Sequence, residues 1–131
     1  MPWDDTDEVR KACLEADLIV NCTPIGMYPQ VDATPIPAES LTKGLVYDLV
    51  YNPAATRLLR EAQAAGCRTI GGLEMLVGQA RKQFEWWTGV CPSAGVMRQA
   101  AIEKLREFTG GGDRVDTLRD GLKTVPYTNR M

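Results

Sequence analysis

Three short segments of the sequence carry groups that could bind a small molecule. They are residues 21–27 (NCTPIGM), 48–53 (DLVYNP) and 71–76 (GGLEML), and each follows a run rich in apolar residues. Glycine lets the backbone approach a ligand closely, while Asn, Thr and Tyr side chains offer hydrogen bonds. Any one of these segments alone could be an ordinary turn. Three of them at the carboxyl ends of consecutive strands favour a ligand-binding edge of an α/β sheet.

The sequence limits the chemistry that these segments can perform. It contains no histidine, which excludes Ser-His-Asp and Cys-His nucleophilic catalysis. An acid or base would have to be Lys, Asp, Glu or Tyr, or lie on another chain. The four cysteines form no C-x-x-C pair, and in the absence of histidine this spacing argues against a zinc site. We therefore predict no metal-binding residue in this chain, and we expect Cys22 and Cys67 to be buried as small hydrophobic residues.

A phosphate-binding loop is also missing from the sequence. Neither G-x-G-x-x-G nor G-x-x-x-x-G-K-[ST] occurs in it. The run of three glycines at 110–112 follows a predicted helix, whereas a phosphate loop follows a strand and opens a helix. We interpret this run as a helix terminator, so no segment of the sequence is expected to cradle a pyrophosphate.

Three short runs predict the strands that would position these segments. They are residues 18–22, 45–51 and 67–70. The first begins with a stretch that is apolar on both faces, which is typical of a strand buried in a parallel sheet. The connections between them are long enough for parallel crossovers, which need about a dozen residues. The predicted fold class is α/β, namely half of a doubly wound, Rossmann-like parallel sheet of about three strands with flanking helices.

Helical periodicity predicts the elements that flank the strands. Apolar residues within 9–16 recur at helical spacing and indicate a first helix. A second helix is predicted to begin with Asn52 as N-cap and Pro53 at its first position, and to end at Gly66. One helical turn is expected near residues 38–41.

Two longer helices are predicted in the last part of the chain. The first follows Gly71-Gly72 and stops at Gly89, and the second begins after Pro92. The apolar face of the first comprises Leu73, Leu76, Val77, Ala80, Phe84 and Trp87. We divide the chain into residues 1–109, a half domain with closing helices, and residues 110–131, a glycine-rich terminator and an unassigned tail.

Composition excludes several classes of partner. The sequence has 131 residues, of which 44% are hydrophobic and 24% are charged, and its formal net charge is −2. These values are typical of one globular domain and give no overall attraction to nucleic acid or membrane lipid. No apolar run approaches the roughly 20 residues that span a bilayer, and the acidic, polar N-terminus does not have the pattern of a secretory signal. We therefore expect a cytoplasmic protein with no nucleic-acid or membrane partner.

Four stretches of the sequence closely resemble, in order and spacing, the C-terminal half of shikimate dehydrogenases. The resemblance covers roughly residues 3–105. G-x-x-M-L-x-x-Q-A is its most specific motif, whereas N-x-T-P-x-G-M is shared with related families. The stretches are ADLIVNCTPIGM (16–27), VYDLVYNPAATRLL (46–59), GGLEMLVGQARKQFEWWTG (71–89) and PSAGVMRQAA (92–101).

The resemblance implies NADP as cofactor and assigns four residues to its site. Asn21 and Thr23 would lie in the loop that flanks the dinucleotide. Leu49 would line the nicotinamide pocket, and the backbone of Gly72 would approach the nicotinamide ring. This chain alone is nevertheless expected to bind NADP weakly or not at all, because it lacks the glycine-rich loop.

The resemblance also implies shikimate as substrate and two residues that bind it. Tyr51 and Gln79 match the positions that hydrogen-bond the carboxylate or hydroxyls of shikimate. Gln79 lies one turn after Met75, at the margin of the apolar helix face. From the residues alone, a solvated glutamine at a helix margin is the simpler interpretation.

The departures from the family pattern suggest a fragment or truncated form that is inactive alone. In the family, a separate N-terminal domain supplies a catalytic lysine and aspartate, and these have no counterpart here, so the resemblance implies no catalytic residue in this chain. Alternatives are a chain that needs a partner chain, a non-catalytic remnant, or part of a quinate/shikimate dehydrogenase. Half of a doubly wound sheet would expose a strand edge or helix faces, so we also expect a homo-oligomer, ideally a two-fold dimer.

Overall fold

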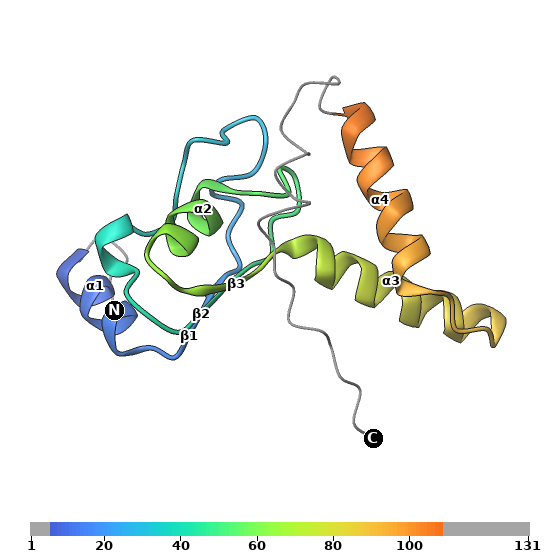
Figure 1. The fold of residues 1–131 in the computed structure, drawn as a ribbon, viewed down its shortest axis with the longest axis horizontal. Helices are drawn as coiled ribbons and strands as arrows, with labels where there is room; N and C mark the ends of the chain where they lie inside the picture. Colours follow the sequence, from blue (N-terminus) through green and yellow to red (C-terminus); the bar gives the residue numbers. More distant parts are fainter. Residues whose placement is uncertain (1–5, 109–131) are drawn as a thin grey trace.

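The structure, a computed structural model, describes residues 6–108, and helices and strands alternate along this part of the chain (Figure 1). The elements are α1 (Thr6–Glu15), β1 (Leu18–Asn21), η1 (Ala38–Ser40), β2 (Leu45–Asp48), α2 (Arg57–Ala64), β3 (Arg68–Ile70), α3 (Gly72–Thr88) and α4 (Ala94–Phe108). The glycine run at 110–112 and the rest of the tail lie outside the described residues. Every helix within 6–108 is too short or too polar to span a bilayer.

The three strands form one parallel sheet in the order β1-β2-β3, which confirms the predicted fold class. Leu18 pairs with Leu45 and Asn21 with Asp48, so β1 and β2 end at the same level. The carboxyl ends of the strands therefore meet at one edge of the sheet.

The start of β2 requires a glycine. Gly44 has a φ of +85°, and a Cβ there would lie 2.6 Å from the Asp17 carbonyl oxygen.

One face of the sheet is packed and the other is open. Val46 is fully buried beneath α2, whose Leu58, Leu59 and Ala62 belong to the same core. Ile19 packs against this core as well, because alternate side chains along a strand point to opposite faces. Its neighbours Leu18 and Val20 point the other way and are 53% and 42% exposed.

Helices α3 and α4 pack on each other and extend away from the sheet (Figure 1). The first turns of α3 bury Leu73 and Val77, as the helical periodicity predicts. Further along the predicted apolar face, Phe84 and Trp87 are 42% and 74% exposed. Arg81 ties α3 to the segment that leads into α4 by donating from Nε to the Pro92 carbonyl oxygen over 2.9 Å. The C-terminal half of α3 lies beyond the sheet, and α4 is its neighbour there.

Two predictions need correction. Helix α2 begins at Arg57 with Thr56 as N-cap, and not at Pro53 with Asn52 as N-cap. The Thr56 hydroxyl caps the helix by accepting a bond from the Leu59 amide, and it also donates a tertiary bond to a buried carboxylate. Cys22 is exposed, because it follows the last residue of β1 on the open side, whereas Cys67 is buried as predicted. The helix stop at Gly66 is confirmed, with a φ of +83°.

Candidate functional site

The carboxyl ends of β1 and β2 are joined by a buried network of polar side chains. The Asp48 carboxylate is fully buried and accepts three hydrogen bonds. Its Oδ1 accepts from Asn21 Nδ2 and from the Val50 amide, each over 3.0 Å, and its Oδ2 accepts from the Thr56 hydroxyl over 2.6 Å. Buried charge is tolerated when it is hydrogen-bonded on every side. The network therefore links β1, β2 and the start of α2 at the edge where a ligand would bind.

Asn21 and Thr23, predicted to flank a cofactor, shape the loop after β1. Asn21 Oδ1 accepts from both the amide and the hydroxyl of Thr23, over 3.0 and 2.7 Å. The Thr23 hydroxyl in turn accepts from the Ile25 amide over 3.2 Å, and Asn21 Nδ2 also donates to the Ile25 carbonyl oxygen over 3.3 Å. Asn21 is 4% exposed and Thr23 is half-buried. Their polar atoms are thus largely used within the protein, and they define the backbone that a ligand would meet.

Leu49 and Gly72, also predicted for the cofactor site, are brought into direct contact. A Cβ atom built on Gly72 would lie 2.2 Å from the Leu49 carbonyl oxygen and 2.7 Å from the Val50 carbonyl carbon. No side chain fits there, because such separations are far inside van der Waals contact. Gly72 therefore lets the first turn of α3 pack against the chain as it leaves β2.

Tyr51 and Gln79, predicted to bind substrate, both lie at the surface. Tyr51 is 41% exposed and stands three residues after Asp48, in the loop that leads to α2. Gln79 is exposed and lies about two turns into α3. Both side chains are accessible to a small polar molecule in solvent.

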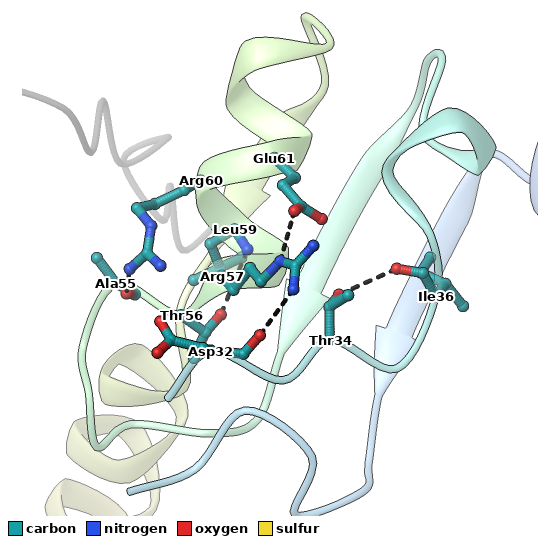
Figure 2. Close-up of polar contacts among 9 residues, drawn as sticks. All are labelled: Asp32, Thr34, Ile36, Ala55, Thr56, Arg57, Leu59, Arg60 and Glu61. Carbon is teal, nitrogen blue, oxygen red and sulfur yellow. Dashed lines mark hydrogen bonds and ion pairs between the residues drawn. The ribbon is translucent and has the colours of Figure 1, made fainter. Parts of the chain in front are cut away.

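Arginines at the start of α2 hold the loops around this edge (Figure 2). Arg57 donates from Nη1 to the Asp32 carbonyl oxygen over 2.8 Å and pairs with Glu61 through Nε over 2.6 Å. Arg60 Nη1 donates to the Ala55 carbonyl oxygen over 2.8 Å. The connector after β1 and the loop before α2 are thus tied to the same helix.

Sequence reasoning missed Asp48 and Thr56 as residues of this site. The available signal was a carboxylate at the end of an otherwise apolar strand, where an unpaired charge would be costly.

Tyr47 is the nearest titratable neighbour with a shifted pKa. Burial raises the pKa of Tyr47, and the negative charge of Glu74 raises it further. A tyrosine with a raised pKa keeps its proton at neutral pH, so it is no general base. Among residues 6–108, no three Cys, Asp or Glu side chains cluster so as to hold a metal ion.

Comparison with known proteins finds similarity to one enzyme family over most of this chain. Residues 72–102 match the family model described as the shikimate 5'-dehydrogenase C-terminal domain. The shikimate dehydrogenase (NADP(+)) of Methanosarcina mazei is 48% identical over 99 residues, which cover 75% of this chain and 35% of the relative. That of Methanopyrus kandleri is 46% identical over 104 residues, which cover 78% of this chain and 36% of the relative. The chain thus spans about a third of the length of these relatives.

Solved structures agree in fold as well as in sequence. The shikimate 5-dehydrogenase of Thermus thermophilus in complex with NADP(H) and shikimate aligns with a TM-score of 0.67 and 41% identity, covering 72% of this chain and 36% of that one. A quinate dehydrogenase from Corynebacterium glutamicum in complex with NAD aligns with a TM-score of 0.69 and 36% identity, covering 75% and 35%. At 36% and 41% sequence identity, both similarities extend beyond the fold to the sequence.

Proposed function

This chain belongs to the shikimate dehydrogenase family, as a counterpart of its C-terminal part, and we propose that it forms the cofactor-side wall of an NADP-dependent shikimate dehydrogenase site. The reaction is the interconversion of 3-dehydroshikimate and shikimate. The observation that carries this proposal is the edge at which the three strand ends meet, with Leu49 against Gly72 and Asn21 bonded to Thr23. Relatives of this chain have been solved with NADP+ and with NADP(H) and shikimate.

The residues at this edge are compatible with the nicotinamide end of the cofactor. When bound, NADP exchanges a hydride with the substrate carbon. Leu49 offers an apolar side chain, and Gly72 lets α3 begin directly beside it, because the Leu49 carbonyl group occupies the place of a side chain at residue 72. The turn built by Asn21 and Thr23 would flank the dinucleotide. A glycine-rich loop for the pyrophosphate is absent from the sequence, so the cofactor must be held largely by other parts of the enzyme.

Substrate recognition is assigned to Tyr51 and Gln79. Both are exposed, and both carry neutral hydrogen-bonding groups that suit the carboxylate and hydroxyls of shikimate. Neither group transfers a proton readily at neutral pH. We assign the proton transfer to a lysine and aspartate pair supplied from outside the matched region, so the residues of this chain bind and orient the substrate.

The assignment of Gln79 is tested in a chimera. The matched region of the Methanosarcina mazei enzyme is replaced by the corresponding residues of this chain, and kcat/KM for shikimate is measured. Losing a hydrogen bond to the charged carboxylate costs about 1.5–3 kcal/mol, so Gln79→Ala should lower kcat/KM about ten- to a hundredfold. Gln83→Ala is the matched control, because Gln83 is exposed one turn later on the same helix. Equal values for the two variants would refute the role of Gln79.

Quinate is the second candidate substrate. It is favoured by the likeness to the Corynebacterium glutamicum quinate dehydrogenase, whose structure contains NAD. Quinate and shikimate share the carboxylate that Tyr51 or Gln79 would bind, so this half of the site accommodates either. The ratio of the two kcat/KM values in the same chimera decides between them.

Self-association is a further part of the proposal for the chain in isolation. Leu18 and Val20 leave apolar surface on the open sheet face, and Trp86 on α3 is 87% exposed. Covering such surface against a second copy is favourable by about 25 cal/mol per Å². Light scattering should therefore give the mass of a two-fold dimer at high concentration, shifted towards monomer in Trp86→Glu but not in Gln83→Glu. A monomer at all concentrations would contradict this expectation.

A further inference from the structure

We propose that Asp48 is a positioning residue that fixes the backbone on which Tyr51 stands. The importance of that backbone for substrate rests on the proposed function. The positioning itself concerns the ligand-free chain. Asp48 is fully buried, and no role in contacting a ligand is assigned to it.

Asp48 determines where the chain leaves the sheet. The Leu49 amide donates to the Asn21 carbonyl oxygen over 3.1 Å, as the last bond from β2 to β1. The next amide, that of Val50, turns back to Asp48 Oδ1 over 3.0 Å. An amide bonded to a side chain two residues earlier can no longer extend a strand. The chain therefore turns at residue 50, immediately before Tyr51.

The backbone of Tyr51 is held on both sides. Val50 precedes it and is bonded to Asp48, while Asn52 follows it and accepts at its carbonyl oxygen from the Tyr28 amide over 2.8 Å. Tyr28 belongs to the loop after β1, whose base is fixed by Asn21, and Asn21 is itself bonded to Asp48. One carboxylate thus anchors the loop that carries Tyr51 and the loop that lies against it.

The second carboxylate oxygen extends the anchor to α2. Asp48 Oδ2 accepts from the Thr56 hydroxyl over 2.6 Å, and Thr56 caps α2 through the Leu59 amide over 3.3 Å. Residues 50–56 are therefore held at both ends by the same side chain. Gly72 supports the start of this segment, since the backbone of Leu49 and Val50 packs directly against it.

Hydrogen exchange of the full, ligand-free chain tests this role. Asp48→Ala should raise the exchange rates of the Val50 and Tyr28 amides about ten- to a hundredfold beyond any change in the sheet amides, as expected for loss of a bond to a charged group. Asp48→Asn keeps an acceptor for Val50 and should restore most of the protection. Ala62→Gly is the control, because it loosens a buried helix site without touching the network.

The outcomes separate positioning from general stability. A uniform rise across all amides in Asp48→Ala, as in Ala62→Gly, would overturn the proposal. If Asp48→Ala does not fold, Thr56→Val can be used instead, because it removes one of the three bonds to Asp48. Thr56→Val should still speed exchange at the Val50 amide several-fold relative to the sheet amides. Equal changes at Val50 and in the sheet would also overturn the proposal. These measurements need no ligand, so they stand apart from the test of Gln79 in the chimera.

Discussion

The 131-residue chain on its own should show no measurable shikimate-dependent reduction of NADP+. Most of the binding free energy of a dinucleotide comes from pyrophosphate contacts at a glycine-rich helix N-terminus and from ribose contacts. Loss of only two charge-assisted hydrogen bonds, at about 1.5–3 kcal/mol each, weakens the binding of the dinucleotide by roughly two to four orders of magnitude. Lack of general acid–base catalysis lowers the rate by about another 10²–10⁴-fold. The measurement is the absorbance of the reduced nicotinamide during incubation of purified chain with shikimate and NADP+.

The chimera with the Methanosarcina mazei enzyme is the positive control for this assay. Turnover by the isolated chain that disappears in Gln79→Ala would contradict the prediction and would indicate a site completed by self-association. Turnover that survives Gln79→Ala would instead come from a contaminating host enzyme. Gln83→Ala again controls for a general effect of substitution on α3.

Gly72→Ala should destabilise the chain strongly for so small a change. The added methyl group would overlap the Leu49 carbonyl oxygen at 2.2 Å and the Leu49 carbonyl carbon at 2.5 Å, and these are backbone atoms that cannot rotate away. Forcing a methyl group into a packed site typically costs about 1–3 kcal/mol, and relief would require the start of α3 to move. Urea denaturation should therefore give a free energy of unfolding that is lower by about this amount.

Gly78→Ala is the matched control for this substitution. Gly78 lies inside the same helix, but apart from its neighbours in the helix no heavy atom stands within 4 Å of its ideal Cβ position. Replacing an unhindered helical glycine with alanine is stabilising by about 0.5–1 kcal/mol. The two variants should thus change stability in opposite directions. An unchanged Gly72→Ala would show that the close approach to Leu49 is not a constraint. A destabilised Gly78→Ala would show that alanine is unfavourable in α3 for another reason.

The sheet was predictable because its signals are local. Leu18–Asn21, Leu45–Asp48 and Arg68–Ile70 are short runs bounded by loop or turn residues, and the connections between them are long enough for parallel pairing. The edge at which the site residues gather follows from that topology alone. Sequence therefore predicted where Asn21, Leu49 and Gly72 would lie, although not the contacts that they make.

The errors arose where tertiary contacts decide between local alternatives. Asn52-Pro53 is a good helix start by local rules, but Thr56 gains a bond to Asp48 and moves the start of α2 to Arg57. The period of α3 predicts an apolar face but not which of its residues are covered, so only the structure shows that Val77 is buried and Trp87 is exposed. The role of Asp48 depends on a partner 27 residues earlier, and no short-range pattern records such a pair.

The buried bonds between Asn21, Asp48 and Thr56 have a consequence for how this site can diverge. Each partner constrains the others, because a single replacement leaves a donor or acceptor without a mate inside the protein. The Tyr51 side chain is exposed and lies outside this network, so it can be replaced without changing the path of the loop. If Tyr51 binds substrate as proposed, changes in substrate choice are expected at exposed side chains of this kind while the buried bonds stay in place, and paired substitutions at 21 and 48 would indicate that the network has been rebuilt.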